Sequence, residues 1–170
     1  MTVDTSFQLQ FDNNVVEHLG LKLYQNKPTR VIAEVLSNSW GAEAKSVLIN
    51  LNAGQERWVS VIDNGYGMTR DDIKGSFLVI GQNKRKQGKV GARPTMGRKG
   101  IGKLAPFGIA RTVDLATVGL SLNGDREVTW VRLELPNVLK QGRQGTYTLE
   151  VVHLGDNLDE VPVDADSTGQ

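Results

Sequence analysis

The feature that most constrains this chain is an aspartate and two glycines placed directly after an apolar stretch. Residues 58–62 alternate as a strand does, and Asp63-Asn-Gly65-Tyr-Gly67 follows them. Glycine lets a backbone approach another group closely, and a carboxylate at a strand end can accept a hydrogen bond from an exocyclic amine such as that of adenine. Asp-Asn-Gly is also ordinary β-turn chemistry, so the motif alone leaves both interpretations open.

A β-hairpin and two helices are expected before this motif. Residues 45–51 alternate like 58–62, and the turn residues Asn52-Ala-Gly-Gln between them predict a hairpin. A short helix is predicted over Val15 to Tyr24, and Pro28 suits the first turn of a second helix that ends near Gly41. The apolar residues of the second helix recur at helical spacing, at Val31, Ile32, Val35, Leu36 and Trp40.

Further helices and a run of strands are expected after the motif. Thr69 is predicted to cap a short helix with Asp71 and Asp72 in its first turn. A long basic loop is predicted over residues 81–97, followed by a short apolar helix over 102–110. Strands are predicted at 112–122, 127–135 and 146–152. This order is typical of an α+β two-layer sandwich with helices on one face of a sheet.

The composition agrees with one cytoplasmic globular domain. The 170 residues suffice for a core, and 39% hydrophobic and 23% charged residues are near the soluble average. No apolar run approaches the roughly 20 residues of a membrane-spanning helix, and the first residues lack the layout of a signal peptide. The absence of cysteine excludes disulfides and thiolate metal sites. The net charge of +1 does not decide about nucleic acid, although residues 84–98 carry basic side chains and no acidic ones.

Two polar side chains four residues apart lie beside the apolar stripe of the second helix. Glu34 and Asn38 share a helix face, and polar groups beside a buried stripe need partners. A hydrogen bond between neighbours on a solvated face would satisfy them. The pair by itself therefore does not indicate a site.

Glycines and a lysine gather before the helix expected at 102–110. In the stretch Gly97-Arg-Lys-Gly100-Ile-Gly102-Lys103, main-chain N–H groups can close on phosphate oxygens, helped by the helix dipole and the lysine. A flexible basic connector is the alternative interpretation. The stretch also matches the beginning of the P-loop pattern, but Leu104 lacks the hydroxyl that would bind Mg²⁺. No buried strand precedes it, which also argues against a dinucleotide-binding loop.

Taken in order, these motifs resemble those of the GHKL ATPase domain shared by gyrase B, Hsp90, histidine kinases, MutL and MORC proteins, with wording closest to MutL, MORC and Hsp90. The match spans about Val31 to Val152 and implies a Bergerat-type ATP-binding fold with a mixed, mostly antiparallel sheet. The residues that carry it are Glu34-x-x-x-Asn38, Asp63-x-Gly65-x-Gly67-Met68, Gly97-x-x-Gly100-Ile101-Gly102-Lys103 and Gly145-Thr146.

The resemblance implies ATP and Mg²⁺ as ligands and a role for each matched residue. Glu34 would be the general base that polarises the attacking water, and Asn38 would bind Mg²⁺. Asp63 would accept the adenine amine, helped through water by Thr146. The early glycines would let the base approach the backbone, and the later ones would wrap the phosphates. The remaining residues expected to contact ATP are Ala42, Gly65, Gly67, Met68, Lys84, Gly97, Gly100, Ile101, Gly102 and Lys103.

The resemblance also sets expectations about domains and partners. Residues 1–155 would form the ATP-binding domain, with an ATP lid at about 82–96, and residues 156–170 an acidic tail or the start of a linker in a longer protein. Such ATPases act as nucleotide-gated conformational switches. A low intrinsic rate and an ATP-dependent homodimer of the full-length protein are therefore expected. A nucleic-acid partner stays open, and no membrane partner is expected.

Two alternatives to hydrolysis stay open as well. Histidine or serine kinases of this family usually lack the glutamate, so Glu34 favours an ATPase over a kinase. The second alternative is an ATP-binding module without turnover. Relatives commonly carry an acidic residue where this chain has Gly41. The absence of that acid leaves undecided which hydrogen bonds form next to the general base.

Pro106 also falls early in the expected short helix, where it is tolerated only near the first turn.

Overall fold

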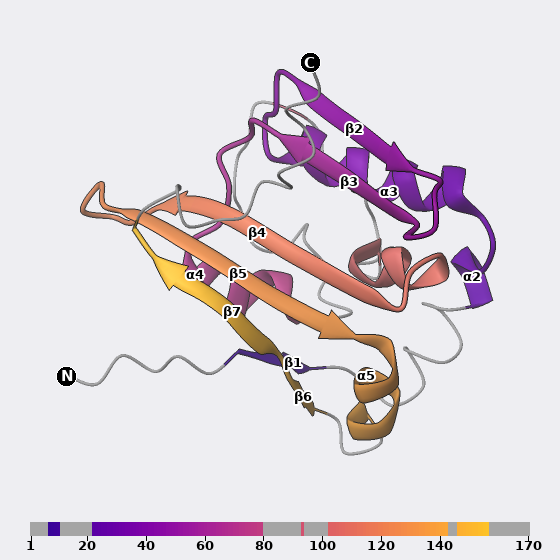
Figure 1. Ribbon diagram of the computed structural model, residues 1–170. Coiled ribbons are helices and arrows are strands. Elements are labelled where there is room, and N and C mark those ends of the chain that lie inside the picture. Colours follow the sequence, from indigo (N-terminus) through magenta and orange to yellow (C-terminus); the bar gives the residue numbers. More distant parts are fainter. Residues whose placement is uncertain (1–6, 11–21, 80–92, 94–101, 143–145, 157–170) are drawn as a thin grey trace.

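The computed structural model describes residues 7–10, 22–79, 93, 102–142 and 146–156 (Figure 1). The helices are α2 (Lys22–Tyr24), α3 (Pro28–Gly41), α4 (Arg70–Asp72), the π-helix η2 (Ile73–Phe77), the 3₁₀-helix η4 (Gly102–Gly108) and α5 (Leu135–Gly142). The strands are β1 (Gln8–Gln10), β2 (Val47–Asn52), β3 (Trp58–Asp63), β4 (Thr112–Leu120), β5 (Arg126–Glu134), β6 (Thr146–Thr148) and β7 (Glu150–Gly155).

The described strands form three antiparallel sheets. β1 pairs with β6, β2 pairs with β3, and the third sheet has the order β4-β5-β7. The predicted hairpin is confirmed, with Val47 opposite Asp63 and Asn52 opposite Trp58. In Figure 1 α4 and η2 lie behind the three-stranded sheet and α3 lies behind the hairpin. The predicted α+β architecture is therefore confirmed.

Among the residues that the structure describes, two clusters of buried side chains make up the core, and η4 contributes to both. Leu104 and Phe107 of η4 belong to the larger cluster beneath the three-stranded sheet. Ala105 packs with Tyr24 of α2 and Val31 of α3 in the smaller cluster. η4 thereby joins the helix that carries Glu34 to the main sheet. The other members of the larger cluster are Phe7, Ile73, Leu78, Val131, Leu133, Val138, Tyr147 and Leu149.

The second predicted helix is confirmed as α3, with Pro28 in its first turn. It ends where the Ala42 N–H donates to carbonyls of the last turn. Its burial differs from the predicted apolar stripe at one end. Ser39 is 2% exposed, whereas Trp40 is 38% exposed because it lies on the outer side of the helix beneath the Arg93 guanidinium.

The start of α4 is confirmed in detail. The Thr69 hydroxyl accepts from the Asp72 N–H at 3.1 Å, and the Thr69 N–H donates to the Asp72 carboxylate at 3.2 Å. This reciprocal capping box satisfies donors that a helix start leaves open. Glu127 of β5 accepts a further hydrogen bond, from the Arg70 N–H, at 2.8 Å.

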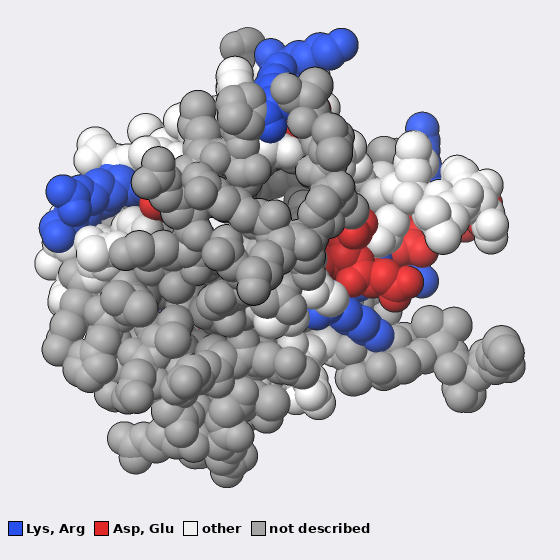
Figure 2. All heavy atoms as spheres, turned by 180° about the vertical axis from the view of Figure 1, so that it is seen from behind, with Lys and Arg blue, Asp and Glu red and all other residues white. Residues whose placement is uncertain are grey.

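Seen from behind, acidic side chains of the described residues gather on one side of the molecule, next to basic ones (Figure 2).

Three elements differ from the sequence-based expectation. Strand β5 ends at Glu134, and the chain continues into α5 with Pro136 in its first turn, where proline costs no hydrogen bond. The strand expected at 146–152 is divided into β6 and β7, because residues 146–148 pair with β1 whereas residues 150–155 pair with β5. The short helix expected at 102–110 is a 3₁₀-helix with Pro106 inside it, where a proline has no N–H to donate to an α-helical ladder.

The first predicted helix is only partly covered by the structure. Residues 22–24 are helical as α2, and residues 15–21 lie outside the described residues. None of the helices in the described ranges has the length and apolar character needed to cross a membrane.

Candidate functional site

Asp63 stands at the end of β3 with both carboxylate oxygens held by donors from the protein. The hydroxyl of buried Ser39 donates to Oδ2 at 2.8 Å, and the Gly65 N–H donates to Oδ1 at 2.9 Å. The residue is nonetheless exposed. A carboxylate can accept about four hydrogen bonds, so Asp63 keeps acceptor capacity for a ligand amine.

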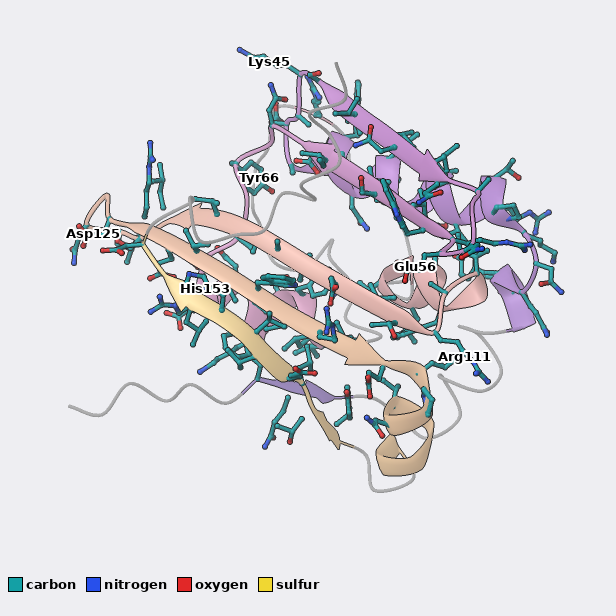
Figure 3. The ribbon with its side chains drawn as sticks, viewed as in Figure 1. Lys45, Glu56, Tyr66, Arg111, Asp125 and His153 are labelled. Atoms are coloured by element: carbon teal, nitrogen blue, oxygen red, sulfur yellow. The ribbon has the colours of Figure 1, made fainter. Side chains whose placement is uncertain are left out.

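The loop after Asp63 is fixed against the turn that follows α3. Asn64 Oδ1 accepts from the N–H groups of Lys45 and Ser46, each at 2.8 Å. The Tyr66 N–H donates to the Ala42 carbonyl at 2.9 Å, and its hydroxyl donates to the Gly41 carbonyl at 3.1 Å. Figure 3 shows Tyr66 in the connection that leaves β3 and leads to α4. The loop is therefore preorganised before any ligand binds.

Both glycines of this loop are required by the packing of the protein itself. A Cβ atom at Gly65 would lie 2.6 Å from the Ala42 carbonyl oxygen. Gly67 has a φ of +67°, and a Cβ there would overlap with the Val118 carbonyl. The neighbouring Met68 N–H donates to Thr117 Oγ1 of β4 at 3.0 Å. The contact of these glycines with adenine stays a prediction.

Gly67→Ala is expected to destabilise the fold by about 3 kcal/mol or more, since it adds left-handed strain to a collision with backbone. Urea unfolding followed by circular dichroism measures this change. Gly75→Ala is the matched control, because no atom lies within 4 Å of a Cβ built at that helical glycine. The control is expected to be neutral or slightly stabilising. Equal midpoints for Gly67→Ala and the wild type would contradict the described loop.

Glu34 lies on α3 and faces the start of η4. The Tyr24 hydroxyl donates to Glu34 Oε1 at 2.9 Å. The Gly102 backbone lies directly against Oε2, since a Cβ at that position would overlap with the carboxylate. Asn38 follows one helical turn later and is exposed. The middle of α3 therefore places a carboxylate at the first residue of η4, and its C-terminal end places the Ser39 hydroxyl on Asp63.

The Tyr24 hydroxyl stays protonated over the ordinary pH range. Burial and its hydrogen bond to Glu34 raise the pKa of Tyr24 from 10.0 to about 12. The folded state thus holds this proton more tightly than the unfolded chain does. The resulting stabilisation is complete below pH 10 and is lost as the pH rises toward 12. Tyr24 is therefore a hydrogen-bond donor to Glu34 at pH values below 10.

In Tyr24→Phe the free energy of unfolding is expected to fall less steeply between pH 10 and 12 than in the wild type. Urea unfolding at several pH values in this window, with both proteins side by side, measures the two slopes. Identical slopes would show that the Tyr24–Glu34 hydrogen bond does not hold the proton.

Comparison with known proteins identifies the domain. Residues 26–161 match the family described as histidine kinase-, DNA gyrase B-, and HSP90-like ATPase. The chain belongs to this family. Membership confirms the resemblance drawn from the motifs, and ATP binding is the property that the family shares.

Individual relatives of this domain are longer proteins. The chain is 38% identical over 114 residues to a putative type II restriction enzyme, HgiDII, of Herpetosiphon aurantiacus, covering 66% of this chain and 18% of that protein. It is 30% identical over 84 residues to the DNA mismatch repair protein MutL of Anaplasma phagocytophilum, covering 49% of this chain and 13% of that protein. It is 26% identical over 119 residues to MutL of Beijerinckia indica, covering 67% and 19%. The chain thus spans less than a fifth of each of these relatives.

Of the remaining residues predicted to contact ATP, the structure describes Lys103 and Thr146 and leaves the others outside the described residues. The Lys103 ammonium donates to the carbonyls of Ser76 and Val79, the latter at 3.0 Å, and so caps the end of η2. Thr146 lies in β6, paired with Gln10 of β1, far from β3 in Figure 1, so the structure does not bring it beside Asp63. The other predicted contacts, Lys84, Gly97, Gly100 and Ile101, lie outside the described residues.

The residues present fit a magnesium ion that is bound mainly by phosphate and water. Within the described ranges, no group of three His, Cys, Asp or Glu side chains is placed to hold a metal by itself. Mg²⁺ usually keeps several waters and takes one or two protein oxygens together with substrate phosphates. The exposed Asn38 amide, four residues after Glu34 on the same helix face, is the side chain that would supply such an oxygen.

Sequence reasoning missed three partners of the predicted residues: Ser39 for Asp63, Tyr24 for Glu34 and Thr117 for Met68. A serine at the buried edge of α3 was a weak signal, because a small hydroxyl one residue after Asn38 faces a neighbouring element. The other two partners meet the motifs only through tertiary packing, and no spacing in the sequence indicates them.

Proposed function

We propose that this domain binds ATP with Mg²⁺ and hydrolyses it. The observation that carries the proposal is the bridge made by α3. The middle of the helix presents Glu34 to Gly102, at the start of η4, and its C-terminal end holds Asp63 through Ser39. One helix would thereby position both the residue that recognises adenine and the residue that acts at the γ-phosphate. Catalysis by positioning requires such a rigid element.

In this proposal, Asp63 accepts a hydrogen bond from the adenine amine. Ser39 and the Gly65 N–H fix its carboxylate in the orientation that leaves the remaining lone pairs for the ligand. The loop behind it is held in place, because the Tyr66 N–H donates to the Ala42 carbonyl and the Tyr66 hydroxyl donates to the Gly41 carbonyl. A fixed acceptor discriminates between bases, since a base that offers an acceptor leaves the carboxylate unpaired.

Glu34 acts as the general base for hydrolysis. Tyr24 occupies Oε1, which leaves Oε2 on the side of Gly102 for a water molecule. The water oxygen attacks the γ-phosphorus, its proton passes to Glu34, and the bond to the β–γ bridging oxygen breaks to release ADP and phosphate. Asn38 would hold Mg²⁺, whose chemistry is to neutralise the charge on the phosphates.

Release of phosphate from ATP by the purified chain, with and without Mg²⁺, tests this function. Slow turnover is expected with Mg²⁺, and none after chelation of the metal. Binding of ATP without release of phosphate, even at high protein concentration, would favour the alternative of a module without turnover.

We further propose that ATP gates dimerisation of the full-length protein and that the switch serves a process on DNA. The names of the reported relatives refer to such processes, namely restriction and DNA mismatch repair. The chain spans only a small share of each relative's length. Sedimentation of the full-length protein with a non-hydrolysable ATP analogue, and its hydrolysis rate with and without duplex DNA, test these two steps. A monomer in every nucleotide state contradicts the first, and a rate indifferent to DNA contradicts the second.

A further inference from the structure

The turn after α3 contains a strained residue that its surroundings must hold in place. Glu43 has a φ of +61°, in the left-handed region that favours glycine. A residue other than glycine is strained in this region and stays there only when other contacts fix it. The Ala44 N–H donates to the Ser39 carbonyl at 3.1 Å, and the Glu43 N–H to the Trp40 carbonyl at 3.1 Å.

Arg93 supplies the contacts that fix this turn from outside. Its guanidinium lies 4.4 Å from the centre of the Trp40 ring, and its Nη1 donates to the Ala44 carbonyl at 2.8 Å. Its backbone N–H donates to Glu43 Oε1 at 3.1 Å, and its Nε lies 3.8 Å from Glu43 Oε2. We name this set, Arg93 with Trp40, Glu43 and Ala44, the arginine clamp. It joins residue 93 to the end of α3 by side-chain and main-chain contacts together.

The other side of the same turn carries the loop that follows Asp63. The Ala42 carbonyl accepts from the Tyr66 N–H, and a Cβ at Gly65 would lie 2.7 Å from the Ala42 Cβ. Any displacement of residues 42–44 must therefore displace Gly65, whose N–H orients the Asp63 carboxylate. Arg93 and the loop with Asp63 therefore both contact the short turn at residues 42–44.

We propose that Arg93 is a positioning residue for nucleotide binding, acting through the turn at 42–44 on the Asp63 loop. The inference rests on the proposed role of Asp63 in binding ATP. Arginine suits the task because its planar guanidinium can stack on an aromatic ring and, at the same time, donate hydrogen bonds within its own plane. Lysine cannot do both. Residue 93 also falls within the expected lid at about 82–96, so the clamp ties one point of that segment to the adenine side of the site.

The affinity for ATP, measured by titration calorimetry, tests the clamp in four proteins: wild type, Arg93→Ala, Glu43→Asn and the double variant. Asparagine tolerates the left-handed backbone but removes the carboxylate. Each single variant is expected to raise the Kd for ATP about tenfold. The double variant is expected to show about the same tenfold rise, because both changes break one clamp. A direct contact of Arg93 with phosphate predicts instead that the two effects multiply, and that result would overturn the proposal.

Two further variants sharpen the test. Arg93→Lys keeps the charge and is expected to bind ATP as weakly as Arg93→Ala, so full affinity in this variant would overturn the role of the stacked guanidinium. Arg111→Ala is the matched control at an exposed arginine, which Figure 3 shows at the other end of β4 from Tyr66, and it is expected to bind like the wild type. If the wild type binds no ATP, the proposed function fails and the inference with it. If the wild type and both Arg93 variants bind equally, the inference alone fails.

Discussion

Glu34→Gln is expected to lower the rate of ATP hydrolysis at least about 100-fold, the scale of a lost general base, while the Kd for ATP stays within about threefold. The substitution keeps the shape of the side chain. The Tyr24 hydroxyl still finds a carbonyl oxygen in place of Oε1, and an amide fits the space beside Gly102. What is lost is the ability to take a proton from water. Phosphate release under single-turnover conditions, with titration calorimetry for binding, separates the two effects.

Glu56→Gln is the matched control for Glu34→Gln. Glu56 is exposed in the turn between β2 and β3 and is labelled in Figure 3, so Glu56→Gln should hydrolyse ATP at the wild-type rate. Retention of hydrolysis in Glu34→Gln would remove Glu34 from the chemistry. Loss of ATP binding in that variant would instead assign Glu34 to the binding site.

Asp63→Asn is expected to weaken ATP binding at least about 100-fold, because it exchanges a charged acceptor for a group that is partly a donor. Both carboxylate oxygens already accept hydrogen bonds, from Ser39 and from the Gly65 N–H. An amide nitrogen that faces the Gly65 N–H would set two donors against each other. An amide turned the other way would use Ser39 as acceptor and keep only one oxygen for Gly65 and the ligand.

Asp125→Asn is the control for this variant. Asp125 is exposed in the turn between β4 and β5, away from Tyr66 in Figure 3. The Kd of the Asp125→Asn variant for ATP should therefore equal that of the wild type. The melting temperature of Asp63→Asn, recorded alongside, shows whether the variant is folded. A folded Asp63→Asn that binds ATP normally would overturn the assignment of the adenine amine to this residue.

Much of the fold was predictable from local chemistry. Pro28, the alternation on either side of the turn at 52–55, and Thr69 followed by Asp72 specify a helix, a hairpin and a capped helix with short-range signals. The errors arose where long-range contacts decide. The division of the last predicted strand depends on β1 at the other end of the chain, which pairs with β6 while β5 pairs with β7. The helix α5 begins after a strand whose apolar pattern runs on to Leu135.

The candidate site shows the same division. The order of the motifs predicted the residues Glu34, Asn38 and Asp63, because each type of chemistry needs a particular side chain at a particular point of the fold. The structure adds what holds them: Ser39, Tyr24 and Arg93, which lie far from their partners in sequence or carry no motif. Spacing cannot reveal such partners, since their contacts are set by the packing of α3 on the hairpin and on η4.

The central claim is that this ATPase-family domain recognises adenine through Asp63. The most direct test is titration calorimetry of the purified chain with ATP and with GTP, each in the presence of Mg²⁺. The two nucleotides share the same triphosphate, but guanine presents a carbonyl oxygen where adenine presents its amine. The account predicts binding of ATP and at least about 30-fold weaker binding of GTP, because a carbonyl facing the carboxylate leaves it without a donor. Equal affinities for ATP and GTP would contradict it.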